Sequence, residues 1–321
     1  FTSKEFMNVL QTTENGWAKD EILTQHIMEA MDTSDQEDFV FTVSVQGHGN
    51  YPETQLIENP KIKVEGIEDE ALKNKWEYYV NQVYEMDQFV GDLIKAVEAR
   101  KEPSVVVFYG DHLPTMGLKA EDLKSRYLYN TNYVIWDNVG LQKQDKNIPA
   151  YQLMSEILNR LDIHSGTVFN YHQQRKGTKN YLSDLELLQY DILYGKQYVY
   201  NNHPPITEGH MVMGIRDVSL SSIVPQLSSG YSLYGENFTK YSRVYVNGEK
   251  QKSSFLNNTR INLSETELQD GDVIQVGQVG SSDTIFRMSD KYIYQNGQLV
   301  KQEGTATDKD KSWVDQEYDV K

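Results

Sequence analysis

The sequence predicts an α/β domain with a mainly parallel sheet and flanking helices, followed by a small all-β sandwich. Over residues 1–205, strand-like runs alternate with amphipathic helical runs, a pattern typical of a parallel sheet covered by helices. Over residues 206–305, the helical pattern stops and short β-type runs are separated by turn residues. A Pro-Pro pair lies near the change of pattern, where a linker is expected.

Helices and strands of the first region follow from residue spacing and residue type. Three runs have apolar residues at helical spacing, at 19–31, 69–100 and 150–161. Three others are rich in β-branched and aromatic residues and are expected to be strands, at 38–45, 104–109 and 132–137. The first of these strands is almost continuously apolar, which predicts burial on both faces of a sheet.

The second region is expected to form its own domain. Its β-type runs are joined by turn signals such as Asn247-Gly248 and Asn296-Gly297. Residues 306–321 are polar, and we expect them to fray as a tail.

Composition excludes several classes of function. The chain has 321 residues and a net charge of -16, so a nucleic-acid partner is not expected, because such binding depends on Lys and Arg. It has no cysteine, which excludes disulfides, Cys-ligated zinc and a cysteine nucleophile in this sequence. No run approaches the roughly 18 apolar residues of a membrane span.

Polar clusters follow two of the expected strands. Asp111 and His112 come directly after 104–109, and His48 lies in a Gly-rich stretch after 38–45. The carboxyl ends of parallel strands meet at one sheet edge, where ligands bind in open α/β sheets. A carboxylate beside an imidazole suits Mn²⁺ or Zn²⁺ better than Mg²⁺ or Ca²⁺. The clusters therefore predict a shared metal or phosphate site.

Structural roles are the alternative for the same residues. Asp111 could cap the turn that follows the strand, and His112 could be a partly buried histidine bonded to a carbonyl. His48 could be an ordinary histidine of a Gly-rich loop.

Longer motifs strengthen the functional interpretation. "FVFTVSVQGHGNYPE", "YYVNQVYEMDQFVGDLI" and "PSVVVFYGDHLP" occur in this order, with "GWAKDEIL" before them and "NYVIWDN" after them. Together they resemble the C-terminal half of the extracellular domain in the lipoteichoic acid synthase family. These enzymes are sulfatase-like phosphoglycerol transferases of the alkaline phosphatase superfamily. The resemblance extends over about residues 1–200.

The resemblance implies a role for each of the three residues. Asp111 and His112 match adjacent ligands of one metal ion, which is expected to be Mn²⁺, with Mg²⁺ or Zn²⁺ as alternatives. His48 matches a histidine that contacts the substrate phosphate or the leaving group. The family's threonine nucleophile and its glutamate ligand fall before Phe1, so we expect no catalytic nucleophile and no turnover in this sequence.

The resemblance also implies a setting and partners. The implied activity transfers glycerol phosphate from a phospholipid through a threonine intermediate. It would take place at the outer face of the cell membrane, with this part of the protein soluble and extracellular. The partners would be a phospholipid head group or a glycerol phosphate polymer.

The β region has a resemblance of its own. "YSLYGENFTKYSRVYVNGEKQKSSF", followed by "ELQDGDVIQVGQV", is similar to immunoglobulin-like domains of the IPT/TIG kind. Such a module would be a spacer or a surface that binds cell-wall glycan or protein.

Three other functions remain open at this level. A sulfatase or a phosphoethanolamine transferase of the same superfamily would share the metal ligands, and a sulfatase would need a Cys or Ser for formylglycine. A non-catalytic wall-associated binding protein would keep Asp111 and His112 for folding only.

Overall fold

The computed structural model describes residues 3–203, 212–227 and 229–307. The chain divides into two compact units. The first unit comprises Phe1–Glu102, Tyr109–Tyr133 and Met211–Lys321. The second comprises Pro103–Phe108 and Val134–His210. Among the described residues, no helix is both long enough and apolar enough to cross a membrane.

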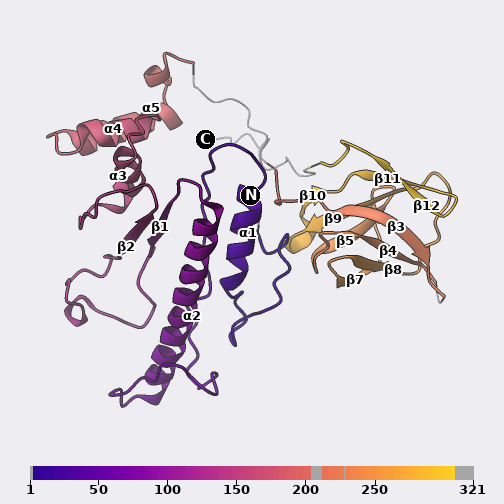
Figure 1. Ribbon diagram of the computed structural model, residues 1–321, viewed down its shortest axis with the longest axis horizontal. Coiled ribbons are helices and arrows are strands. Elements are labelled where there is room, and N and C mark those ends of the chain that lie inside the picture. The colour runs from indigo at the N-terminus through magenta and orange to yellow at the C-terminus, as the bar shows by residue number, and fades with distance from the viewer. Residues whose placement is uncertain (1–2, 204–211, 228, 308–321) are drawn as a thin grey trace. The chain divides into compact units, whose positions relative to one another are not determined.

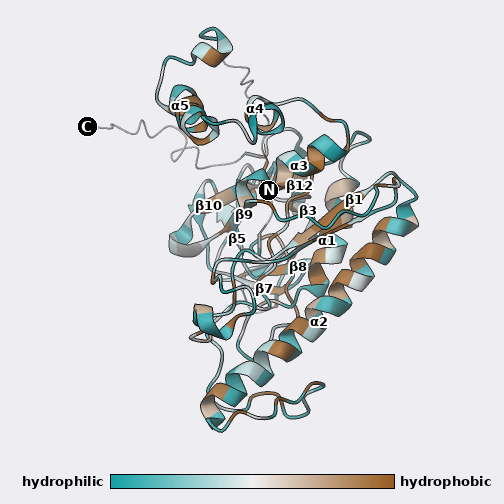
Figure 2. Cartoon of the chain, turned by 90° about the vertical axis from the view of Figure 1, so that its left-hand side faces the viewer, coloured by the Kyte–Doolittle hydropathy of each residue, from teal (hydrophilic) through white to brown (hydrophobic). Residues whose placement is uncertain are grey.

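Two predicted helices of the first unit are confirmed, α1 (Glu21–Met31) and α2 (Glu70–Arg100). Asp69 caps α2, because its carboxylate accepts a hydrogen bond of 3.0 Å from the Leu72 amide. This bond satisfies one of the amides that the start of a helix leaves without a partner. Figure 2 shows hydrophobic and hydrophilic residues interleaved along α2, as expected for a helix with one face packed.

Residues 103–203 form two strands and three α-helices. They are β1 (Val105–Tyr109), β2 (Tyr133–Asp137), α3 (Leu153–Arg160), α4 (Thr167–Arg175) and α5 (Tyr181–Leu193). The strands predicted at 104–109 and 132–137 and the helix predicted at 150–161 are thus confirmed. Sequence analysis missed α4 and α5, although α5 has apolar residues at helical spacing (Leu182, Leu185, Leu188 and Ile192).

The sheet of this region is not parallel. β1 and β2 form a two-stranded sheet. The Gly110 amide bonds the Asn132 carbonyl at 3.2 Å, and the Asn138 amide bonds the Ser104 carbonyl at 3.2 Å. The two bonds pair the end of one strand with the start of the other, so the strands run antiparallel. The predicted mainly parallel sheet is therefore wrong for the residues that the structure describes.

Residues 38–45, predicted as a central strand, are extended without forming a strand. Phe39, Phe41 and Val43 expose 74%, 66% and 65% of their surface. A strand needs a neighbour to pair its backbone amides and carbonyls. None of the sheets in the described part of the chain includes this segment. The prediction of a strand buried on both faces is therefore wrong for this segment, because apolar composition does not supply a neighbouring strand.

The β-rich region contains ten strands between residues 219 and 302. They are β3 (Ser219–Pro225), β4 (Tyr231–Glu236), β5 (Ser242–Val246), β6 (Glu249–Lys250), β7 (Ser253–Asn257), β8 (Arg260–Leu263), β9 (Val273–Val279), β10 (Ile285–Met288), β11 (Lys291–Gln295) and β12 (Gln298–Gln302). One sheet has the order β12-β11-β9-β5-β6, with β10 also paired to β9. The other has the order β3-β4-β8-β7, and both are antiparallel. Figure 1 shows these strands gathered together.

Both sheets contribute to one hydrophobic core. Leu233 and Ile261 from one sheet, and Val244, Ile274 and Val276 from the other, have no exposed surface. At about 1.5 to 3 kcal/mol for each fully buried aliphatic side chain, this core is the main source of stability in the region. The predicted β-rich region is thus confirmed, whereas the immunoglobulin-like sandwich and the likeness to IPT/TIG domains stay predictions.

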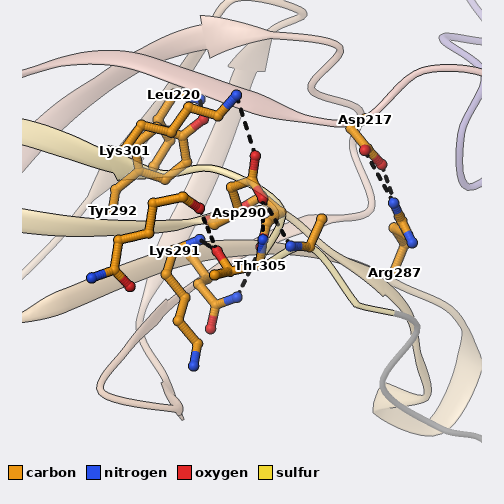
Figure 3. A network of polar contacts seen from close by, with 12 residues as sticks. Asp217, Leu220, Arg287, Asp290, Lys291, Tyr292, Lys301 and Thr305 are labelled. Carbon is orange, nitrogen blue, oxygen red and sulfur yellow. Dashed lines mark hydrogen bonds and ion pairs between the residues drawn. The ribbon is translucent and has the colours of Figure 1, made fainter.

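Hydrogen bonds and ion pairs stabilise both ends of the β-rich region, as Figure 3 shows. The Asp290 carboxylate accepts hydrogen bonds from the amides of Thr305 and Ala306, both at 2.8 Å. It also lies 3.2 Å from the ammonium of Lys301. Asp217, just before β3, pairs with the Arg287 guanidinium on β10 through bonds of 2.8 and 3.0 Å.

The predicted boundary near residue 205 and most of the predicted tail at 306–321 lie outside the described residues. All ten strands fall within the predicted 206–305.

Candidate functional site

A buried polar network anchors the turn that carries His48. Gln46, which is 2% exposed, accepts a hydrogen bond of 2.8 Å from the Asp20 amide. Its own amide group donates to Gln82 at 3.0 Å and to Glu85 at 2.5 Å, both on α2. The network fixes Gln46 between α1 and α2, so the turn that carries His48 begins at a residue with a fixed position.

Asp20 belongs to the same network and lies just before α1. Its carboxylate accepts a hydrogen bond of 2.6 Å from the Ser44 hydroxyl, and Asp20 itself is 2% exposed. Burial raises the pKa of Asp20, although the hydrogen bonds from Ser44 and from the Val45 and Gln46 amides act in the opposite direction. This acid is a structural anchor behind the His48 turn.

Two glycines let this turn approach its neighbours closely. A Cβ at Gly47 would lie 2.9 Å from the Met86 sulfur, and one at Gly49 would lie 2.9 Å from the Thr115 hydroxyl. The second distance shows that the His48 turn lies close to the loop that follows Asp111 and His112. A larger residue at position 49 would push the two loops apart.

Asp111 and His112 form an exposed acid and imidazole pair two and three residues after β1. Asp111 Oδ1 accepts a hydrogen bond of 2.8 Å from the His112 amide, and its Oδ2 lies 3.6 Å from His112 Nε2. His112 Nδ1 lies 2.8 Å from the Leu113 carbonyl oxygen. A carbonyl only accepts, so Nδ1 carries a proton, and in the neutral imidazole Nε2 has the lone pair.

One part of the alternative structural role is present, because His112 bonds a backbone carbonyl. The side chains are nevertheless 80% and 57% exposed, so neither is buried in a packing role. Asp111 Oδ2 and His112 Nε2 are both accessible, and a metal ion prefers these two kinds of donor. The pair therefore fits a divalent metal ion as two of its ligands. Within the described residues, no group of three or more His, Asp or Glu residues could hold a metal ion.

His48 lies beside this pair. Its ring centre is 6.2 Å from that of His112, with the ring planes at 82°. The prediction that strand pairing would bring the two clusters together at the edge of a parallel sheet is wrong. The juxtaposition arises instead from loop contacts such as that between Gly49 and Thr115.

Trp17 is a neighbour of the site that the sequence interpretation missed. Its ring centre lies 5.2 Å from that of His48, at 63°. The turn that carries Trp17 is closed by Thr13, whose amide bonds the Trp17 carbonyl at 2.7 Å. Asn15 in this turn donates to the Asn50 carbonyl at 2.6 Å, which ties it to the His48 loop. Trp17 belongs to the stretch "GWAKDEIL", whose residue spacing does not indicate this contact.

Comparison with known proteins identifies the first region. Residues 3–163 match the family model described as Sulfatase. Over 242 residues the chain is 28% identical to a protein of Rhizobium meliloti (strain 1021) named for the modification of cyclic beta-1,2-glucan. The match covers 62% of this chain and 37% of the relative, so the chain spans well under two thirds of that protein. No solved structure matches the chain.

Proposed function

This chain belongs to the sulfatase family. We propose that Asp111 and His112 bind a divalent metal ion. We also propose that His48 contacts the phosphoryl group that is transferred next to this ion. The observation that carries the proposal is the position of His48, whose ring centre lies 6.2 Å from that of His112. The proposed ion is Mn²⁺, with Mg²⁺ or Zn²⁺ as alternatives. Asp111 Oδ2 and His112 Nε2 would be the ligands, and the bond to Leu113 O would orient the imidazole.

The proposed reaction is the transfer of glycerol phosphate from a phospholipid. The bond between phosphorus and the lipid oxygen breaks, a new bond forms between phosphorus and an acceptor oxygen, and the acceptor's proton passes to the departing lipid alkoxide. When bound, the metal ion would stabilise negative charge on the phosphoryl oxygens. His48 is exposed and anchored through Gln46, so its imidazole can donate a hydrogen bond to the leaving oxygen.

The nucleophile of this proposal is a threonine, which the resemblance to lipoteichoic acid synthases places before Phe1. It would take the glycerol phosphate first and pass it to the acceptor afterwards. The acceptor is a glycerol phosphate polymer or a glucan at the outer face of the cell membrane. The glucan is supported by the name of the Rhizobium relative. A sulfatase or a phosphoethanolamine transferase is the alternative, because both use the same kind of metal site.

Metal binding by this chain tests the site. Mn²⁺ titration by calorimetry or electron paramagnetic resonance should detect weak binding, because two protein ligands form an incomplete shell. Asp111→Asn should weaken it about tenfold or more, since a neutral amide replaces the anionic ligand. Asp162→Asn is a matched control, because Asp162 and His164 form an exposed pair at 2.9 Å outside the site. Equal Mn²⁺ affinity in the wild-type and Asp111→Asn proteins would contradict the metal assignment.

Turnover by the full-length encoded protein tests the reaction. It should be incubated with a phosphatidylglycerol analogue and Mn²⁺, with and without glucan, and in parallel with an aryl sulfate. A glycerol phosphate adduct on a threonine, detected by mass spectrometry and absent in His48→Ala and Asp111→Asn, would support the proposal. Hydrolysis of the sulfate ester without transfer would favour the sulfatase.

A further inference from the structure

The first unit contains a crevice well separated in sequence from Asp111 and His112. Its volume is about 510 Å³, which lies in the range of about 300–1,000 Å³ typical of small-molecule sites. One wall consists of α1 and the segment before it, and the other includes residues 215–216 and the turns at Asn237 and Asn258. Both the sulfatase-matching part of the chain and the β-rich region therefore line it.

Buried contacts hold the N-terminal wall in place. The Thr239 hydroxyl donates a hydrogen bond of 2.7 Å to the Glu5 carbonyl, and these residues are 0% and 8% exposed. The neighbouring Phe6, which lines the crevice, has its ring centre 6.4 Å from that of Phe286. The crevice is thus bounded by packed residues and not by a free chain end.

Amide side chains make up half of the polar lining, five of its ten polar residues. They are Asn8, Gln11, Gln25, Asn237 and Asn258. Each amide offers a carbonyl acceptor and an NH₂ donor, which together match a hydroxyl that donates and accepts. Two of the amides are fixed by protein contacts, Gln25 to Glu29 at 2.9 Å and Asn237 to the Asp217 carbonyl at 2.8 Å. Such preorganisation reduces the entropy lost when a ligand binds.

The charges that line the crevice balance one another. Lys19 pairs with Glu85 at 2.9 Å, and His26 lies 3.2 Å from Glu29. Glu21 and Arg216 add one charge of each sign. A phosphate or sulfate would meet carboxylates as well as cations here, so the lining favours a neutral ligand.

Apolar side chains complete the lining. Leu10 is 90% exposed, and Phe6, Ile22 and Ile215 also line the crevice. Hydroxyl-matching amides beside apolar side chains suit a sugar, which presents hydroxyls at its rim and C–H groups on its ring faces.

We propose that this crevice binds a short neutral oligosaccharide. The proposal does not depend on the chemistry at Asp111 and His112, and it assigns the β-rich region a part in holding a glycan. Binding here would keep a glycan chain attached to the protein without using the metal site.

Saturation-transfer NMR and calorimetry with the wild-type chain test this inference. The probes are a linear β-glucan tetrasaccharide, cyclic β-1,2-glucan and chitotetraose, with glycerol 1-phosphate as the charged comparison. At least one neutral probe should bind, and glycerol 1-phosphate should not compete with it. Gln25→Ala and Asn258→Ala should each weaken that binding about tenfold. Asn258→Trp, which fills the crevice, should abolish it.

The controls separate this site from the proposed metal site. Asp111→Asn and Gln174→Ala, an exposed amide on α4, should bind the oligosaccharide as the wild type does. Melting curves of all variants establish that they are folded. The inference is overturned if no neutral probe binds, if the folded crevice variants bind equally well, or if Asp111→Asn abolishes binding.

Discussion

The carboxylate of Asp290 joins three groups near the end of the β-rich region (Figure 3). Burial opposes its ionisation, but the hydrogen bonds from the Ala306 amide, Lys301 and the Thr305 amide outweigh that effect. The pKa of Asp290 therefore lies below its usual value of 3.8. A lowered carboxyl pKa contributes stability that is present above pH 3.8 and is lost as the pH falls through the folded-state pKa.

Asp290→Ala should therefore lower the free energy of unfolding by about 2 kcal/mol at pH 7, because it leaves two amides and an ammonium without their acceptor. The difference from the wild type should shrink below pH 4. Urea denaturation at pH 7 and pH 3.5 measures both effects. Glu267→Ala, an exposed acid of the same region, is the control and should change stability by less than about 0.5 kcal/mol. An equal loss in both variants would contradict this role of Asp290.

At the scale of elements, His172 links the helices of the second unit. It is 4% exposed on α4, and its Nδ1 lies 2.6 Å from the hydroxyl of Tyr181 on α5. That hydroxyl accepts a hydrogen bond of 2.8 Å from Gln152, just before α3, and keeps its own proton available for His172. Burial lowers the pKa of His172, which favours the neutral imidazole.

Acid should weaken this helix cluster. A histidine with a lowered pKa stabilises the fold above pH 6.5, and the contribution falls as the pH drops toward the folded-state pKa. The loss can reach at most about 1.4 kcal/mol for each pH unit in that window. The melting temperature of the wild type should fall between pH 7.5 and pH 5.5 more than that of His172→Asn, whose side chain does not titrate there. Parallel falls in the two proteins would show that His172 is not responsible.

The extended segment 38–45 exposes apolar side chains that pack against little within the described chain. Replacing Phe39, Phe41 and Val43 together by Ser should change the free energy of unfolding by less than about 1 kcal/mol, since exposed side chains contribute little to stability. The same change should slow aggregation at 37 °C, measured by light scattering, because exposed strand-like segments associate. Leu233→Ser, in the buried core, should instead unfold the β-rich region. A large loss of stability in the triple variant would mean that the segment is packed in solution.

At the scale of the whole chain, the β-rich region has a core of its own. The buried cluster that includes Leu233 and Tyr292 draws all its members from residues 218–292. We therefore expect residues 212–307, expressed alone, to fold. Circular dichroism should show β-structure with a cooperative thermal transition, and a disordered or helical spectrum would contradict the expectation. Loss of the contact between Thr239 and Glu5 should lower stability without preventing folding.

Residue spacing in the sequence indicated α1, α2 and α3 to within three residues at each end, together with the strand that precedes the candidate site. Helical spacing predicted α2, and the Asp69 cap marks its start. Short β-type runs and turn signals predicted a β-rich region over residues 206–305, where the described residues form ten strands. These features are local, because propensity, periodicity and turn chemistry act over a few residues. Asp111 and His112 are neighbours in the sequence, so their proximity was also predictable from it.

Which segments meet depends on the packing of the whole chain. A strand forms when a neighbour supplies its hydrogen bonds, so the apolar run 38–45 stayed extended, and β1 paired antiparallel with β2. The contact of His48 with His112 and with Trp17 depends on loops that pack at Gly49 and Thr115, residues 66 positions apart along the chain (115 − 49). No periodicity encodes such a contact, because it results from the packing of whole elements. The crevice between α1 and the β-rich region could not be predicted from the sequence either, because it also results from the packing of whole elements.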